Sequence, residues 1–291
     1  MYSTNVMPTK FYLLGGVVII ASLPVTVRAF RVLRAAVRQH LSDGCSTKRS
    51  GLQAASSSSV AGGNKGTPLD LAGMRENYVS VGIDESNIPS VPHKLMTKWI
   101  EDACNCKEVI DPNAMCLSTV GEDGRPSARF VLMKGFSDKG VVWYTNYNSR
   151  KAKELLNFPH AAVTFWWGAL HRSVRFEGTV SKMSAEESDA YYSSRPTGSK
   201  IGAWVSDQSQ LIGSREELDQ KAKKMEQSFA SYGDDIPRPP HWGGFRLRPK
   251  VVEFWEGQPS RLHDRVVYSR SSPDGEGPDG GDEWTISRLQ P

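Results

Sequence analysis

Between residues 93 and 105, apolar side chains recur at steps of three and four. This spacing places them on one side of a helix, so it predicts an amphipathic helix over 93–105. The apolar residues on that side are Leu95, Met96, Trp99, Ile100 and Ala103.

Beyond this helix the pattern changes to short runs rich in Val, Phe and Trp, separated by turns that contain Gly, Asp or Pro. Such runs are typical of strands, and the glycine-containing turn at 121–124 predicts a hairpin. The predicted strands are 115–120, 126–133, 141–146, 161–167, 173–180, 244–248, 251–255, 265–269 and 284–288. Their spacing predicts a mainly β fold with α, namely an antiparallel barrel surrounded by helices.

Three further helices are predicted from residues that cap helix N-termini. Ser149 precedes a short helical segment. Ser184 with Glu187, and Ser214 with Glu217, have the spacing of a capping box, in which each side chain satisfies a backbone N–H group.

Residues 1–68 differ in composition from the rest of the chain. Within them, 11–27 is a mostly apolar run, slightly short of the roughly 20 residues that a membrane-spanning helix needs. Four arginines follow at helical spacing, with no acidic residue before Asp43. Three interpretations remain open: a mitochondrial presequence, an uncleaved signal anchor, or an extension with no targeting role. Residues 42–68, rich in Ser and Gly, are predicted to be disordered.

The predicted organisation is an N-terminal extension over 1–68, a core over 69–241 and C-terminal strands of the same fold over 242–291. The net charge of +4 comes from the extension, which has eight basic residues and one acidic residue. The remainder is slightly acidic, so it has no general attraction for nucleic acid. With 38% hydrophobic and 23% charged residues, the chain is not collagen-like, wholly disordered or a multi-span membrane protein.

The four cysteines are too few in 291 residues for a disulfide framework, and Cys104 and Cys106 lack partners at zinc-binding spacing. We therefore expect reduced thiols, no metal and a cytoplasmic protein. The arginine-rich N-terminus leaves a mitochondrial location open, and contact with a membrane is expected only if the apolar segment is an anchor.

Two adjacent cations, Arg150 and Lys151, occupy the first turn of the helix that Ser149 caps. Backbone N–H groups at a helix N-terminus favour an anion, and the planar fork of Arg suits phosphate. The alternative is a pair of solvated charges, but cations at this end oppose the helix dipole. The segment is therefore a candidate phosphate site.

A second candidate is Arg195, at a helix end stopped by Pro196, with the hydroxyls of Tyr191 and Ser199 within two turns. These groups suit a second phosphate through one bidentate and two neutral hydrogen bonds. The alternative is that Arg195 caps the C-terminal carbonyl groups of the helix.

The third candidate contains Arg261, His263 and Arg265, which alternate and are predicted to share one face of a strand. Such a face requires an anion or an electron-rich ligand opposite it. The sequence contains no P-loop, no G-x-G-x-x-G motif and no Ser-His-Asp order, so hydrolase and dinucleotide-fold interpretations lack support.

These candidates belong to a series of short motifs in a fixed order. The motifs are RFVLMKG (129–135), YTN (144–146), SRK (149–151), SRP (194–196), IGAWVS (201–206), QS (208–209), WGG (242–244), EFWEG (253–257), RLHDR (261–265) and the terminal RLQP (288–291). Each motif is weak alone, but together and in this order they resemble the pyridoxine/pyridoxamine 5′-phosphate oxidase family. The resemblance extends from about residue 74 to residue 291.

The resemblance implies an FMN-binding split β-barrel with peripheral helices, a homodimer with the flavin at the subunit interface. The implied cofactor contacts are Arg129, Phe130, Val131, Leu132, Tyr144, Thr145, Arg150, Lys151, Gln208, Ser209, Trp255 and Arg265. The implied substrate contacts are Arg75, Tyr78, Lys134, Tyr191, Arg195, Ser199, Arg261 and His263. Of these, Arg261 and His263 are the implied catalytic residues.

The activity implied by the resemblance is oxidation of pyridoxine and pyridoxamine 5′-phosphates to pyridoxal 5′-phosphate, a step of vitamin B6 salvage. A hydride passes to FMN, and O2 then reoxidises the flavin and yields hydrogen peroxide, with ammonia released from the amine. One alternative is a non-catalytic FMN or pyridoxal-phosphate binding protein, which would not require Arg261 and His263. The other is a split-barrel reductase with a different electron donor, which the complete set of substrate residues disfavours.

The sequence departs from the family pattern in three places. Ser173 stands where the family has Gln in an Arg-Gln-Val strand, and its side chain is too short for the same reach to the flavin. Lys200 stands where Gln is usual. The basic residues that some members carry after the tyrosine matched by Tyr78 are absent from 79–82.

Overall fold

The computed structural model describes residues 80–270 and 283–291 and, before them, positions 13–14, 17–18, 71, 73–74 and 77–78. Contacts divide the chain into two units, Met1–Ile19 with Asn77–Pro291, and Ile20–Glu76. All described helices and strands belong to the first unit.

Most of the N-terminal predictions concern residues outside the described part. Of the apolar run 11–27, only β1 (Leu13–Leu14) and β2 (Val17–Val18) are described, and they pair antiparallel. The arginines at 28–38, the serine-rich segment 42–68 and the candidate substrate residue Arg75 all lie outside it. Within the described part, no helix is long and apolar enough to cross a membrane.

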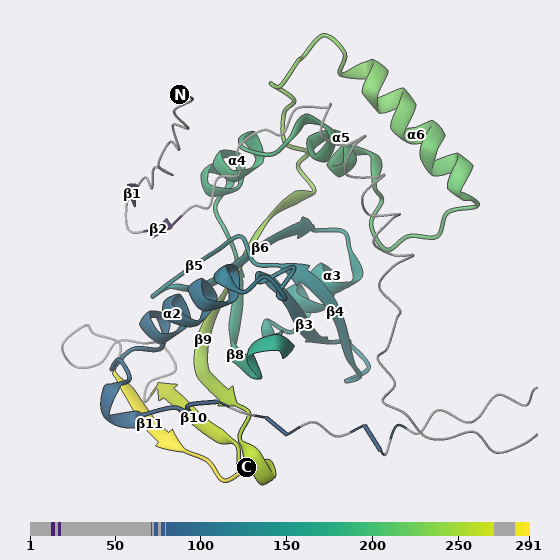
Figure 1. The fold of residues 1–291 in the computed structure, drawn as a ribbon. Helices are drawn as coiled ribbons and strands as arrows, with labels where there is room; N and C mark the ends of the chain where they lie inside the picture. The colour runs from purple at the N-terminus through teal and green to yellow at the C-terminus, as the bar shows by residue number, and fades with distance from the viewer. Residues whose placement is uncertain are drawn as a thin grey trace, which may run out of the picture. The chain divides into compact units, whose positions relative to one another are not determined.

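A curled antiparallel sheet of nine strands forms the body of the first unit (Figure 1). Its strands are β3 (Ala114–Val120), β4 (Pro126–Leu132), β5 (Gly135–Ser137), β6 (Gly140–Asn146), β7 (His160–Trp167), β8 (Arg172–Lys182), β9 (Trp242–Glu256), β10 (Asp264–Arg270) and β11 (Trp284–Arg288). The strand order is β11-β10-β9-β8-β7-β3-β4, with β6 paired to β9 and β5 paired to β6. The predicted mainly β architecture is confirmed.

Five described helices accompany the sheet. They are α2 (Pro92–Asn105), α3 (Arg150–Asn157), α4 (Ala185–Ser193), α5 (Thr197–Val205) and α6 (Arg215–Ser228), with short 3₁₀ turns η1 (Glu85–Asn87), η2 (Gly168–Leu170) and η3 (Pro259–Arg261). The predicted amphipathic helix is α2, whose apolar side is buried. Three predicted caps are confirmed, because Ser149, Ser184 and Ser214 each accept a hydrogen bond from a backbone N–H of the following turn.

Strand β9 is longer than predicted. The sequence predicts two strands, 244–248 and 251–255, but the structure has one strand of 15 residues that contains Pro249. Its first half pairs with β6 as far as Leu247, and its second half pairs with β10 from Val251 onward. Pro249 has no N–H donor and lies where β9 changes partner, so the strand continues past it. Opposite, β8 has a register shift between Glu177 and Gly178.

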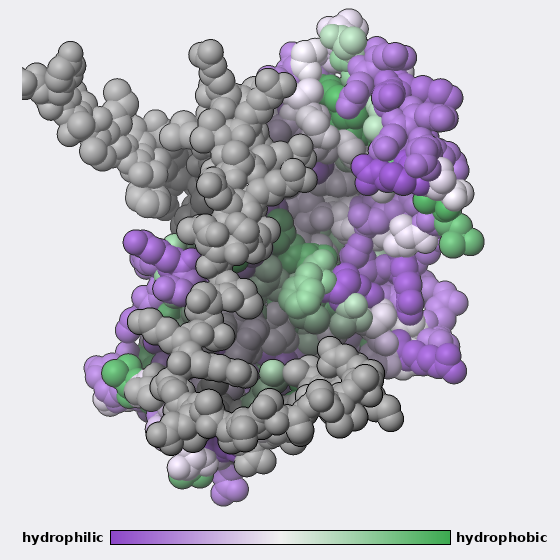
Figure 2. Space-filling model, turned by 45° about the vertical axis from the view of Figure 1, so that its right-hand side comes forward, coloured by the Kyte–Doolittle hydropathy of each residue, from purple (hydrophilic) through white to green (hydrophobic). Residues whose placement is uncertain are grey.

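The core lies on one face of the sheet, where side chains alternate between buried and accessible positions. Phe165, Val174 and Phe254 from three neighbouring strands are fully buried on it. Trp99 of α2 covers this face, with its ring edge-on to Phe254 at 5.2 Å. One side of the surface, shown in Figure 2, carries a patch of apolar surface beside hydrophilic surface.

We predict opposite effects on stability for alanine at two glycines. A methyl group at Gly178 would overlap the backbone carbonyl of Arg248 in β9, so Gly178→Ala should lower the free energy of unfolding by about 3 kcal/mol. Gly202 lies inside α5 with open space around it, so Gly202→Ala should raise that free energy by about 0.5–1 kcal/mol. Urea unfolding measures both, and a Gly178→Ala variant as stable as Gly202→Ala would contradict the strand pairing described.

Candidate functional site

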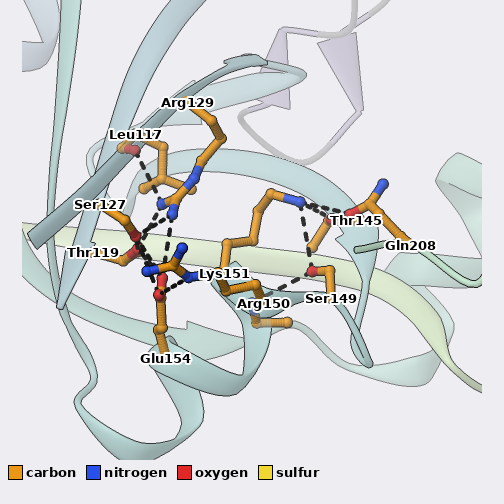
Figure 3. A network of polar contacts seen from close by, with 11 residues as sticks. Leu117, Thr119, Ser127, Arg129, Thr145, Ser149, Arg150, Lys151, Glu154 and Gln208 are labelled. Atoms are coloured by element: carbon orange, nitrogen blue, oxygen red, sulfur yellow. Dashed lines mark hydrogen bonds and ion pairs between the residues drawn. The ribbon is translucent and has the colours of Figure 1, made fainter. Parts of the chain in front are cut away.

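Three clusters of polar and aromatic side chains contain the residues singled out from the sequence. The first, at the N-terminus of α3, joins Arg129 of β4, Thr145 of β6, Lys151 of α3 and Gln208 (Figure 3). Lys151 Nζ donates to Gln208 Oε1 at 2.6 Å and to Thr145 Oγ1 at 3.2 Å. Helix α3 begins here because Ser149 caps it, with the Ser149 hydroxyl accepting a hydrogen bond from the backbone N–H of Ala152.

A buried carboxylate fixes the orientation of the arginines in this first cluster. Glu154 is 6% exposed and accepts from Arg129 Nη2 at 3.2 Å and from Arg150 Nε at 2.8 Å. Thr119 and Ser127 also donate to it. Burial acts to raise the pKa of Glu154, but these hydrogen bonds and the charge of Arg129 together hold that pKa below its usual value. One carboxylate thus faces three cations, and the cluster keeps an excess of positive charge.

Lys151 carries much of that excess. Burial, and secondarily the charge of Arg129, lower the pKa of Lys151 to about 8. The side chain of Arg150, in contrast, is mostly exposed to solvent. The alternative of two solvated charges therefore fits Arg150, most of whose side chain is in water, but it does not fit the more buried Lys151. A phosphate beside Lys151 would restore its ordinary affinity for a proton.

The second cluster surrounds Arg195, between α4 and α5. The Arg195 guanidinium lies over the Trp242 ring at 4.6 Å, and its Nη1 is buried without a hydrogen-bond partner in the described part of the chain. Burial lowers the pKa of Lys134, and the charge of Arg195 lowers it further. Ser199 lies in the first turn of α5. The alternative that Arg195 caps helix carbonyls leaves this buried donor unexplained, whereas an anion would satisfy it.

Stacked rings form one wall of the second cluster. Tyr144 lies against Tyr191 at 3.9 Å and against Trp242 at 5.4 Å, nearly parallel to both. Burial raises the pKa of Tyr144 to about 12, so its hydroxyl stays protonated. Tyr144, assigned to the cofactor by resemblance, thus packs beside Tyr191, which was assigned to the substrate.

The third cluster is aromatic and lies where β9 ends and β10 begins. The His263 ring is 4.7 Å from Trp255 and 5.6 Å from Tyr78. His263 Nδ1 accepts a hydrogen bond from the backbone N–H of Gln258, so the neutral ring carries its proton on Nε2. Burial, then the charge of Arg261, lower the pKa of His263, which favours the neutral form.

The prediction that Arg261, His263 and Arg265 share a strand face is wrong. Arg261 ends the 3₁₀ turn η3, and His263 precedes β10, so only Arg265 belongs to a strand. The chain turns here because Ser260 and Arg261 both have left-handed backbone conformations, with φ of 56° and 62°. The anion opposite Arg265 comes from the protein itself, since Arg265 Nε donates to Glu253 Oε1 at 2.7 Å.

The remaining candidates flank these clusters. Phe130 is 77% exposed and Leu132 is also exposed on the outward side of β4, while Val131 packs against the core. Ser209, next to Gln208, has a left-handed φ of 72°. Sequence reasoning missed Glu154 and Glu253, although the spacing of Arg150 and Glu154, four residues apart on a helix, predicts their ion pair.

The third cluster lies apart from the other two within one copy of the chain. Trp242 and Trp255 stand thirteen residues apart on β9, which is about 43 Å along a strand, so the second and third clusters lie toward its opposite ends. Arg129 faces the core side, since it pairs across the sheet with buried Leu117. Trp255 faces the outer side, where it pairs with Ser173.

Cysteine and metal chemistry add no further candidate in the part of the chain described. Cys104, Cys106 and Cys116 are free thiols there. No group of three or more His, Cys, Asp or Glu side chains is placed to hold a metal ion among the same residues.

Comparison with known proteins gives matches over most of the chain. The family model described as pyridoxamine 5′-phosphate oxidase matches residues 104–255, and the pyridoxine 5′-phosphate oxidase C-terminal dimerisation region matches residues 242–291. The pyridoxine/pyridoxamine 5′-phosphate oxidase of Burkholderia multivorans is 51% identical over 221 residues, which cover 76% of this chain and 99% of the relative. That of Gloeothece citriformis is 47% identical over the same share of this chain and 98% of its own length.

A solved structure shows the same fold. The crystal structure of PhzG from Burkholderia lata 383, in complex with tetrahydrophenazine-1-carboxylic acid, has a TM-score of 0.61 and 30% identity. The match covers 71% of this chain and 95% of PhzG.

We predict that Glu154→Gln destabilises the protein in a pH-dependent way. The folded pKa of Glu154 lies below its ordinary value, so its stabilising effect is present above about pH 4.5 and is lost as the pH falls through the folded pKa. The variant should lose about 1–3 kcal/mol at neutral pH, where a buried hydrogen-bonded carboxylate is removed, and less at low pH. Urea titrations from pH 7 down to about pH 2, which pass below the folded pKa, would measure this.

Glu226→Gln, on the exposed side of α6, is the control and should unfold like the unmodified protein at each pH. A Glu154→Gln deficit that is constant with pH would show that the carboxylate charge is not what holds Arg129 and Arg150.

Proposed function

We propose, because the chain belongs to the pyridoxine/pyridoxamine 5′-phosphate oxidase family, that it oxidises pyridoxine and pyridoxamine 5′-phosphates to pyridoxal 5′-phosphate with bound FMN. The observation that carries the substrate assignment is the buried Nη1 of Arg195, which has no hydrogen-bond partner among the described residues and lies near the charge of Lys134. Two cations whose charges are incompletely neutralised suit a dianionic phosphate.

The first cluster fits the phosphate of FMN. It offers Arg129, Arg150, Lys151 and the N-terminal turn of α3, and the lowered pKa of Lys151 marks a cation that an anion would stabilise. Thr145 and Gln208 already hold the Lys151 ammonium in place. The chemistry supplied by bound FMN is acceptance of a hydride from the 4′ carbon of the substrate and transfer of two electrons to O2, which gives hydrogen peroxide.

The second and third clusters act on the substrate at opposite ends. Lys134, Tyr191, Arg195 and Ser199 bind its phosphate and so fix the distance of the ring from that anchor. Arg261 and His263 orient the ring. Because Nδ1 of His263 is occupied by Gln258, its Nε2–H acts as a hydrogen-bond donor to an oxygen of the substrate rather than as a base. The ring of Tyr78 lies 5.6 Å from the ring of His263, so Tyr78 covers the His263 ring and excludes water from it.

We propose that each complete site is built from two copies of the chain. The second and third clusters lie toward opposite ends of β9, up to about 43 Å apart along the strand, which is far longer than a vitamer phosphate. In a homodimer, the second cluster of one copy, with Arg195, can face the third cluster of its partner, with Arg261. The C-terminal dimerisation region matched by residues 242–291 contains Trp255, Arg261, His263 and Arg265, which supports this arrangement.

The PhzG match raises a second candidate, oxidation of a tricyclic carboxylic acid. A carboxylate carries one negative charge, whereas Lys134 and Arg195 present two positive charges with little compensation from the described residues. A phosphorylated substrate therefore fits the second cluster better.

The proposed reaction predicts that the FMN-loaded protein loses its visible flavin absorbance when pyridoxamine 5′-phosphate is added without oxygen. Admission of air should restore the absorbance and give hydrogen peroxide and pyridoxal 5′-phosphate in equal amounts. Unphosphorylated pyridoxamine is the control and should react far more slowly, because it lacks the group that Arg195 binds. Bound FMN that no vitamer phosphate bleaches would identify a binding protein, and bleaching only by tetrahydrophenazine-1-carboxylic acid would favour that acid as the substrate.

The two-copy site predicts complementation between inactive variants. Arg195→Ala and Arg261→Ala should each lose at least 100-fold in kcat/KM, roughly the loss expected for a deleted charged contact. In a random mixture of co-expressed chains, half of the dimers contain both variants and each has one intact site, so about a quarter of full activity should return.

Arg125→Ala, in the exposed turn between β3 and β4, is the control and should leave the activity unchanged. Absence of recovery in purified mixed dimers would mean that Arg195 and Arg261 of the same copy serve one site.

A further inference from the structure

Trp166 occupies an unusual position on the outer face of the sheet. It is 55% exposed, although it lies within a strand and not in a loop. Through cross-strand pairing it forms a row with Ser173 of β8, Trp255 of β9 and Arg265 of β10. Trp255 and Arg265 are the two residues of this row that the family resemblance assigns to the flavin. Trp166 thus extends the row by one strand beyond Ser173.

Ser173 does not extend toward a ligand in this row. Its hydroxyl donates to the backbone carbonyl of Phe165 at 2.9 Å, within the sheet. The small side chain leaves space above it, and the rings of Trp166 and Trp255 approach across that space to 5.7 Å with an angle of 49°. A glutamine at 173, as in the family pattern, would extend into the same space.

The aromatic surface continues from this pair to the third cluster. Trp255 is 4.7 Å from His263 and 5.9 Å from Tyr78, so a planar ring lying on the two tryptophans would adjoin the residues proposed to orient the substrate. An indole that is half exposed gains from stacking on such a ring, both through burial and through the ring contact.

We propose that Trp166 contacts the isoalloxazine ring of FMN and fills the space that Ser173 leaves where the family has glutamine. The inference rests on the proposed function, since it requires that FMN, held through its phosphate by the first cluster of one copy, lies against the outer face of β7–β9 of the partner copy. Trp166 then replaces a polar contact at position 173 with an aromatic contact from the neighbouring strand.

Titration of the apoprotein dimer with FMN and with riboflavin, followed by flavin fluorescence, tests the contact without reference to turnover. Riboflavin has the same ring and no phosphate, so Trp166→Ala should raise both dissociation constants by the same factor, about threefold to tenfold. Trp166→Phe should retain most of the affinity. Phe158→Ala, which removes an aromatic ring with 44% exposure at the end of α3, is the control and should change neither constant.

A second pair of variants tests whether Trp166 and residue 173 share one space. Ser173→Gln should weaken FMN binding while Trp166 is present, because the longer side chain displaces the indole. In the Trp166→Ala background, the same substitution should restore affinity. Independent, additive effects of the two substitutions would overturn the inference.

The outcomes separate the two proposals. If the unmodified protein binds neither flavin, both the proposed function and this inference fail. If it binds FMN but Trp166→Ala leaves both constants unchanged, or weakens FMN and not riboflavin, only the inference fails. Gel filtration of each variant at the titration concentration completes the test, because affinity lost only together with the dimer would also overturn the ring contact.

Discussion

The shared hydrogen bonding of β9 is the constraint on which the site depends. This strand pairs with β8 along most of its length and with β6 and then β10 on its other side, so its direction and its alternation of faces are fixed at nearly every residue. Trp242 and Trp255 therefore cannot approach each other, and Trp255 cannot turn to the core side. The pairing of β9 therefore keeps the second and third clusters apart in each copy, and for this reason the proposed site requires two copies of the chain.

The arginines of the three clusters differ in whether a carboxylate of the same chain neutralises them. Arg129 and Arg265 each pair with a buried carboxylate of the same chain, Glu154 and Glu253, which fixes their geometry before any ligand arrives. Arg195 is held by the faces of Trp242 and Tyr192 instead, and it retains a buried donor. The paired arginines are preorganised but partly neutralised, whereas Arg195 keeps more of its positive potential, as the proposed binding of a substrate phosphate requires.

Local signals in the sequence predicted much of the fold. The capping serines and the apolar side of α2 act over a single turn, and the structure has these elements where the spacing indicated them. Helix α5 was not predicted from the sequence, because it contains Gly198 and Gly202, which are poor helix formers. Contacts with residues distant in the sequence stabilise it instead. Tyr192 Oη donates to the carbonyl of Lys200, and Lys200 Nζ donates to the carbonyl of Asp234.

The candidate site was predicted less completely than the fold. Residue types and motif order indicated which side chains matter, but not that they divide into three clusters. That division follows from the continuity of β9 through Pro249 and from the backbone at Arg261, and both depend on contacts between strands distant in sequence. The position of Trp166 beside Ser173 likewise follows from cross-strand register, which spacing along the chain does not reveal.

The left-handed backbone at Ser260 and Arg261 has a further consequence. Each of these two adjacent non-glycine residues lowers the free energy of unfolding by about 1–3 kcal/mol, because its backbone adopts a disfavoured conformation. Packing and hydrogen bonds around Gln258 and Asp264 offset that loss in the free protein. Arg261 is therefore held in a strained loop whose conformation is already formed without a ligand. A molecule that binds there would not lose free energy by ordering the loop.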